Sequence, residues 1–163
     1  MTDTRHTLVA LVEDKPGVLN RIASLFRRRS FNIESLAVGG SERPGFSRMT
    51  IVAIGDSAQV EQIRKQLEKL INVVKVSAIT EGDMVTRELA LIKVKATAST
   101  RSEIMQIVSI FRANIVDVAP SSVTVEVTGD EDKVNSLLGL LRDFGVKEVS
   151  RTGRIALTRG SNS

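Results

Sequence analysis

The feature that most constrains this fold is an internal repeat. The pattern I-x-S-x-F-R at residues 22–27 returns at residues 107–112, an offset of 85. A Gly-Asp pair followed by an apolar helical face occurs at residues 55–67 and again at residues 129–141, an offset of 74. Self-similarity of this kind indicates two similar structural units in succession. The difference between the offsets predicts that the second copy lacks 11 residues between its first and second helix.

Hydrophobic periodicity predicts the same order of elements in both copies, βαββαβ. In the first copy we expect strands at 7–13, 31–38, 47–54 and 73–79, and helices at 17–29 and 57–70. In the second copy we expect strands at 86–97, 114–119, 122–128 and 146–158, and helices at 101–112 and 130–142. The short reversal at residues 120–122, opposite the Gly-rich turn at 39–45, is the expected site of the missing residues.

This order predicts the α+β class, with two tandem ferredoxin-like βαββαβ sandwiches, each an antiparallel sheet with two helices on one face. The predicted domains are 1–80 and 86–163, joined by a polar linker at 81–85. Strands such as 7–13 are apolar on both faces, so the sheet face away from the helices also needs cover. We therefore expect an obligate oligomer in which another chain supplies that cover.

The corner between the first strand and the first helix, Asp14-Lys15-Pro16-Gly17-Val18-Leu19, has the chemistry of a small-ligand site. Gly17 has no Cβ to block the approach of a ligand to the backbone. The unpaired N–H groups that follow suit a carboxylate, and Asp14 suits an ammonium. The corner thus offers partners for both ends of a free amino acid. The alternative is a plain helix start, with Asp14 as the N-cap and Pro16 near the first helical position.

The second copy lacks this motif. At the offset of 85 the corresponding residues are Ser99-Thr100-Arg101-Ser102, with neither Pro nor Gly. A requirement of the fold alone would favour similar corners in both copies. The asymmetry therefore favours a ligand-binding role for the first corner.

Composition excludes several classes of function. The chain has no Cys and a single His, which leaves no catalytic triad, no metal site and no catalytic residue to predict. Its net charge is +4, but aromatic residues make up 3% and all five are Phe in apolar patterns, so we expect no nucleic-acid partner. No apolar run approaches the ~20 residues of a membrane helix, and the first residues do not resemble a signal peptide. We expect no membrane association and a cytoplasmic location.

The two copies together resemble the regulatory small subunit of acetohydroxyacid synthase (acetolactate synthase). The D-x-P-G-V-L corner alone is typical of an amino-acid-binding ACT domain. More specific are N-I-E-S-L at 32–36, S-R-M-T-I at 47–51, R-E-L-A-L-I-K-V at 87–94 and F-R-A-N-I-V-D-V at 111–118. The match covers nearly the whole chain.

The resemblance implies that the first copy is an ACT domain that forms a homodimer side by side with a second copy. Valine, or else leucine or isoleucine, would bind at the interface between Asp14, Gly17, Val18 and Leu19 of one chain and Asn32 and Ile33 of the other. From the residues alone, Asn32 could instead be a turn residue with positive φ and Ile33 a core residue. Ser30, where many members carry Gly, and Asp14, where some carry Asn, leave the valine affinity open.

The resemblance also implies that catalysis and regulation are carried by different subunits. A separate catalytic large subunit would hold thiamine diphosphate, magnesium and FAD, and this chain would hold none of them. This chain would raise the activity of the catalytic subunit and confer feedback inhibition by valine in branched-chain amino acid biosynthesis. The residues leave other classes open: an ACT-type module that senses amino acids for transcription or another enzyme, a nucleic-acid-binding sandwich of the same topology, and a stand-alone enzyme.

Overall fold

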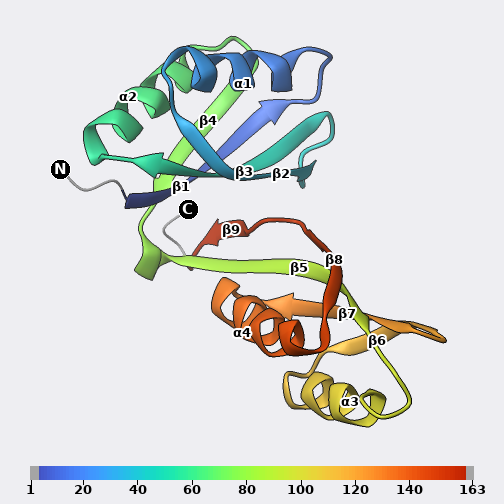
Figure 1. Ribbon diagram of the computed structural model, residues 1–163. Helices are drawn as coiled ribbons and strands as arrows, with labels where there is room; N and C mark the ends of the chain where they lie inside the picture. Colours follow the sequence, from blue (N-terminus) through green and yellow to red (C-terminus); the bar gives the residue numbers. More distant parts are fainter. Residues whose placement is uncertain (1–3, 161–163) are drawn as a thin grey trace. The chain divides into compact units, whose positions relative to one another are not determined.

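The computed structural model describes residues 4–160 (Figure 1). The predicted domain limits 1 and 163 lie outside the described residues. The first elements are β1 (Thr4–Glu13), α1 (Val18–Arg28), β2 (Asn32–Gly40), β3 (Phe46–Gly55), α2 (Ser57–Glu68), β4 (Val73–Ile79) and the 3-10 turn η1 (Glu81–Asp83). They are followed by β5 (Met84–Lys95), α3 (Arg101–Ile110), β6 (Asn114–Ala119), β7 (Ser122–Gly129), α4 (Glu131–Leu141), η2 (Arg142–Phe144), β8 (Val146–Arg151) and β9 (Ile155–Thr158).

The chain divides into two compact units. The first consists of the chain up to Val85 together with the segment from Arg154 onward, and the second is Thr86–Gly153. The segment 81–85, predicted as a linker, holds η1 and the first two residues of β5, and Met84 is buried. The predicted second domain ran to the C-terminus, whereas the residues from Arg154 onward belong to the first unit.

The first unit is an antiparallel sheet in the order β2-β3-β1-β4, with α1 and α2 on one face (Figure 1). Alternation along β1 turns Leu8, Ala10 and Val12 toward the helices, where all three are buried. Helix α1 meets them with Ile22, Leu25 and Phe26 at helical spacing. The predicted ferredoxin-like sandwich is confirmed.

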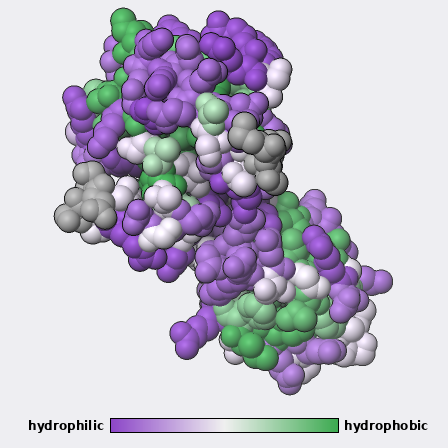
Figure 2. All heavy atoms as spheres, turned by 90° about the vertical axis from the view of Figure 1, so that its left-hand side faces the viewer, coloured by the Kyte–Doolittle hydropathy of each residue, from purple (hydrophilic) through white to green (hydrophobic). Residues whose placement is uncertain are grey.

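The second unit repeats this architecture with its sheet in the order β6-β7-β5-β8, to which β9 adds by pairing with β5. Its core residues on β5, Ala90, Ile92 and Val94, lie 82 positions after their counterparts on β1. This unit also exposes large apolar side chains, and Figure 2 shows a green patch on it. The most exposed are Ile110 and Val118, at 77% and 60%. Such a surface is typical of contact with another chain.

The first helix of each unit ends in the same Schellman motif. Ser30 has a φ of 52°, its N–H donates to Arg27 O, and the N–H of Phe31 donates to Phe26 O. Arg112 has a φ of 54° and makes the equivalent bonds, from its own N–H to Ser109 O and from Ala113 to Val108 O. A residue with left-handed φ, together with these two hydrogen bonds, satisfies carbonyl groups that would otherwise lack a donor at the end of a helix.

The predicted offset of 85 is wrong for the first half of the repeat. Ser30 and Arg112 occupy the same structural position 82 residues apart, so the I-x-S-x-F-R match is three residues out of register. Asp56 and Asp130, which both cap the second helix, keep the offset of 74. The second copy therefore lacks 8 residues rather than 11. They are missing from the predicted hairpin, since β2, its loop and β3 span residues 32–55, whereas β6, its loop and β7 span only residues 114–129.

The C-terminal strand predicted at 146–158 is two strands. β8 ends at Arg151, Gly153 has a φ of 77°, and β9 begins at Ile155. Residues 154–160 cross the helix-free face of the first sheet, where Arg154 Nη1 donates to Thr7 Oγ1 and the N–H of Ala156 to Thr50 Oγ1. Val52 beneath it is fully buried. This part of the open face is covered by the chain itself and needs no second chain.

No described helix is long and apolar enough to cross a membrane.

Replacing Ser30 by Gly should stabilise the protein. Left-handed φ costs an L-residue roughly 1–2 kcal/mol, part of which is offset by the greater unfolded-state entropy of Gly, so we expect a gain of about 0.5–1 kcal/mol in the free energy of unfolding. The matched control is Ala23→Gly, at an exposed helical position in α1, which should lose about 1 kcal/mol. Urea unfolding measures both, and a loss in both variants would contradict the assignment of φ at Ser30.

Candidate functional site

The corner between β1 and α1 is not a side-chain-capped helix start. The N-cap of α1 is Gly17, with a φ of 85° and ψ of −10°, and no side chain bonds to the helix start. Asp14 lies three residues earlier, and its N–H donates to Gly45 O at 2.9 Å. The interpretation of Asp14 as the N-cap is therefore wrong. A β-carbon on Gly17 would meet no atom within 4 Å, so its positive φ, rather than close packing, calls for glycine.

The corner leaves backbone donors open. Val18 N–H is used in a turn, since it lies 3.3 Å from Lys15 O, and Arg21 N–H donates to Gly17 O. Pro16 has no N–H. Within residues 4–160, the N–H groups of Gly17, Leu19 and Asn20 have no acceptor. Open donors at the positive end of a helix dipole are suited to an anion such as a carboxylate.

The four predicted corner residues differ in their exposure and in the groups that they offer to a ligand. Asp14 is exposed, and among the described residues its carboxylate has no hydrogen-bond or ion-pair partner. The Leu19 side chain is 48% exposed and can contact an aliphatic group. Val18 is 5% exposed and belongs to the core. Asp14, Gly17 and Leu19 thus offer a charge, open backbone donors and an apolar side chain.

The equivalent corner of the second unit bonds part of its backbone internally, although the N–H groups of Ser99 and Ser102 have no acceptor within residues 4–160. At the structural offset of 82 it consists of residues 96–99, Ala-Thr-Ala-Ser, rather than 99–102. The N–H of Thr97 donates to Thr100 Oγ1 at 2.9 Å, and the N–H groups of Thr100 and Arg101 donate to Thr97 O. There is again no Pro or Gly. The asymmetry predicted from the sequence persists after the register is corrected.

Asn32 and Ile33 lie at the start of β2, at the edge of the sheet. Asn32 is exposed and has strand geometry, so its interpretation as a positive-φ turn residue is wrong; Ser30 takes that role. Ile33 is partly buried against the core.

One chain does not bring these two residues to its own corner. Asn32 pairs with Ile54, which pairs with Arg5 at the opposite end of β1 from Glu13. Eight residues of strand separate the two positions, about 27 Å at roughly 3.4 Å per residue.

The sequence interpretation missed a polar cluster beneath the corner. Asn72, which precedes β4, accepts the N–H of Glu13 through its carbonyl at 2.8 Å and contacts Arg21 and Glu13 through its side chain. Lys15 Nζ lies 2.8 Å from Glu13 Oε2. This hydrogen bond, helped by those from Asn72 and by the charge of Arg43, holds the pKa of Glu13 below its usual range. Only the tertiary fold joins Asn72 to the corner, so no local signal could have identified it.

Among the residues that the structure describes, no cluster of three or more His, Asp or Glu side chains could hold a metal ion.

Two family models match this chain. One, described as an AHAS small subunit-like ACT domain, matches residues 8–75, and the other, described as the small subunit of acetolactate synthase, matches residues 87–160. The "Probable acetolactate synthase small subunit" of Archaeoglobus fulgidus is 57% identical over 96% of this chain and 98% of its own length. The acetolactate synthase small subunit of Mycobacterium bovis is 53% identical over 98% of this chain and 95% of its own. The crystal structure of the small subunit from Thermotoga maritima superposes with a TM-score of 0.90 at 45% identity, covering 96% and 98% of the two chains.

Lys15→Gln should raise the pKa of Glu13 toward its usual 4.5, because the ammonium that lowers it is removed. Since the folded-state pKa is depressed, the wild-type pair stabilises the protein above the unfolded pKa, and this contribution is lost as the pH falls through the folded value. A carboxyl NMR titration measures the shift. The control Lys69→Gln, an exposed lysine at the end of α2, should leave Glu13 unchanged. An unshifted Glu13 in Lys15→Gln would contradict the assigned cause.

Proposed function

Because the chain belongs to the family of acetolactate synthase small subunits, we propose that it activates a separate catalytic subunit of that enzyme and makes it sensitive to valine. In this proposal the chain carries no catalytic residue. Thiamine diphosphate, magnesium and FAD reside on the catalytic subunit. What this chain contributes is an effector site and the surfaces that transmit its occupancy.

The observation that carries the proposal is the open corner of the first unit. The valine carboxylate lies against the N–H groups of Gly17 and Leu19, and Asp14 receives the ammonium. The isopropyl group packs on Leu19, which is exposed on this chain. The equivalent corner of the second unit has neither Pro nor Gly, and the N–H of its Thr97 is bonded to Thr100 Oγ1, so we propose one effector corner for each chain.

A second copy completes the site in this proposal. The edge of β2 is unpaired within residues 4–160, and it exposes Leu36 and Val38. If the two-fold axis passes through Leu36, the middle of β2, antiparallel pairing of two β2 edges sets Asn32 of one copy beside Gly40 of the other. Gly40 lies in the same cross-strand row as Ser47 and Val12, at the corner end of the sheet. The homodimer thereby brings Asn32 and Ile33 to the corner end of the partner's sheet, which one chain alone cannot do.

Inhibition then follows from linkage. Valine shifts the enzyme toward the inhibited arrangement only to the extent that it binds that arrangement better than the active one. A coupling of ~1–3 kcal/mol is typical of such effectors. The selectivity among valine, leucine and isoleucine is of similar size, since one methylene is worth ~1–3 kcal/mol in an apolar pocket.

The test is reconstitution of the cognate holoenzyme with Gly17→Asp and with Gly17→Asn. Both residues tolerate positive φ, but only Asp sets a negative charge against the valine carboxylate. We expect both variants to activate the catalytic subunit and Gly17→Asp alone to lose inhibition by valine. If the wild-type protein fails to activate the catalytic subunit, the proposed function is refuted. If valine fully inhibits the enzyme reconstituted with Gly17→Asp, the proposed site is refuted.

Subunit complementation tests the shared site. Gly17→Asp damages the corner, and Asn32→Ala the half supplied by the partner, so neither variant alone should bind valine in calorimetry. In a mixed dimer one site combines both lesions and the other combines neither. Equal mixing after subunit exchange should restore about a quarter of the wild-type stoichiometry. If the mixture, like each variant alone, binds no valine in calorimetry, the two residues do not meet across an interface.

A further inference from the structure

The helix-free face of the first sheet carries a row of two cations around a leucine. Leu11 on β1 pairs with Arg48 on β3 and with Lys75 on β4, so the three side chains project from one cross-strand row. Neighbouring strands lie about 4.8 Å apart, which sets the backbones of Arg48 and Lys75 about 10 Å from each other. This row lies beyond the part of the face that the segment from Arg154 covers.

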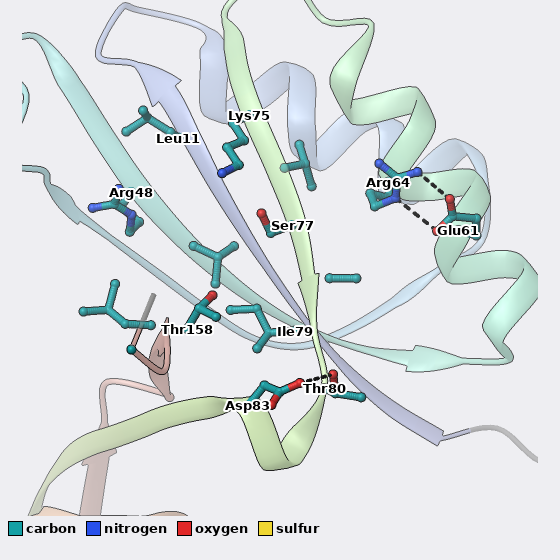
Figure 3. Close-up of a pocket in the computed structure, with 15 residues that line it drawn as sticks. Leu11, Arg48, Glu61, Arg64, Lys75, Ser77, Ile79, Thr80, Asp83 and Thr158 are labelled. Carbon is teal, nitrogen blue, oxygen red and sulfur yellow. Dashed lines mark hydrogen bonds and ion pairs between the residues drawn. The ribbon is translucent and has the colours of Figure 1, made fainter. Parts of the chain in front are cut away.

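The row forms one end of an open groove of about 880 Å³ (Figure 3). All residues that line the groove belong to the first unit. Val9 and Ser77 continue the floor, and Leu157 and Thr158 of β9 form a wall. At the end away from the cations lies Asp83, whose carboxylate accepts a hydrogen bond from Thr80 Oγ1 at 3.1 Å. The groove also reaches around β4, an edge strand that pairs only with β1 within the described residues.

The two cations of the row are available to a partner. Lys75 is exposed and has no ion-pair partner within residues 4–160. Arg48 pairs at 2.6 Å with Glu42, whose side chain is 68% exposed, and such surface pairs contribute little. Arg64 at the rim differs, because hydrogen bonds from its guanidinium to Glu61 and Glu68 neutralise it and raise its pKa.

The second unit supplies an internal comparison. Its residue equivalent to Leu11 is Lys93, which pairs across the sheet with Thr124 and Glu148. Lys93 Nζ lies 3.2 Å from Glu148 Oε2, so this row carries one cation and one carboxylate in place of two cations. The fold therefore does not require two cations in this row.

An edge lysine can simply discourage pairing with other strands. The direction of the side chain argues against that role for Lys75. In Figure 3 its ammonium extends from β4 over the sheet face toward Leu11 and Arg48, into the groove.

We propose that this groove receives an extended acidic segment of a partner protein, whose carboxylates meet Lys75 and Arg48 and whose backbone runs beside the edge of β4. Peptides are commonly recognised in this way: the peptide adds as a strand to an open sheet edge, and pockets bind its side chains. A second copy of this chain is a poor occupant, since a two-fold contact would set the like charges of this row against each other. This inference rests on the proposed function, under which the partner is the catalytic subunit of acetolactate synthase.

The experiment measures the concentration of small subunit that half-activates the cognate catalytic subunit, at low and high salt. We expect Lys75→Glu to raise this concentration at least about tenfold at low salt, and Arg48→Glu to act in the same direction. High salt should weaken the wild type toward the level of the variants. The control Lys69→Glu makes the same charge change at an exposed position outside the groove and should match the wild type.

Calorimetry with valine and thermal unfolding of each isolated variant show that the effector site and the fold are intact. If the wild type activates and Lys75→Glu half-activates at the same concentration, the docking surface is refuted and the proposed function stands. If the wild type does not activate, the proposed function fails, and this inference fails with it.

Discussion

The first unit depends on strand β1 being hydrogen-bonded on both sides. It pairs with β3 along residues 4–13 and with β4 along residues 7–12. Because hydrogen bonds hold the strand on both sides, the face of the sheet on which each of its side chains lies is fixed. Even-numbered residues from Leu8 to Val12 enter the helix-covered core, and the odd-numbered ones between them form the opposite face. The end of the strand delivers the corner at Asp14. The core, the groove and the corner therefore all depend on one strand that is paired on both sides.

Much of this was predictable because both periodicities are local. Alternation along the strands and helical spacing of Ile22, Leu25 and Phe26 suffice to predict βαββαβ and the core. The register of the repeat was not predictable from its best-matching letters. A slip of three residues is nearly one helical turn, so it keeps apolar residues on the buried face, and a pattern of helical residues cannot detect it. The Schellman motifs at Ser30 and Arg112 fix the register because a helix end has a unique position.

The features that the sequence did not reveal are those made by residues far apart in the chain. The strand predicted at 146–158 is interrupted by the turn at Gly153, and only the bonds of Arg154 and Ala156 show that its end packs on the helix-free face of the first sheet. At the corner, the alternative of a plain helix start with Asp14 as its N-cap is wrong. The backbone of Asp14 is held instead by Gly45 of the long hairpin, and Gly17 caps the helix through its conformation alone.

The two units differ in how their polar groups are satisfied, and the differences lie close together. Both strands β1 and β5 have a register shift in the same place, between Leu11 and Val12 and between Lys93 and Val94, so this irregularity belongs to the fold. In the second unit Thr97 N–H bonds to Thr100 after the shift, and Lys93 pairs with Glu148 before it. In the first unit Gly17 begins the helix with no side-chain cap after the shift, and two cations, Arg48 and Lys75, flank Leu11 before it. Leu11 and Asp14 are three residues apart in the chain, so a short stretch of backbone connects the corner to the cation row. Under the proposed function, this is the shortest connection between an effector and a catalytic partner that the first unit contains.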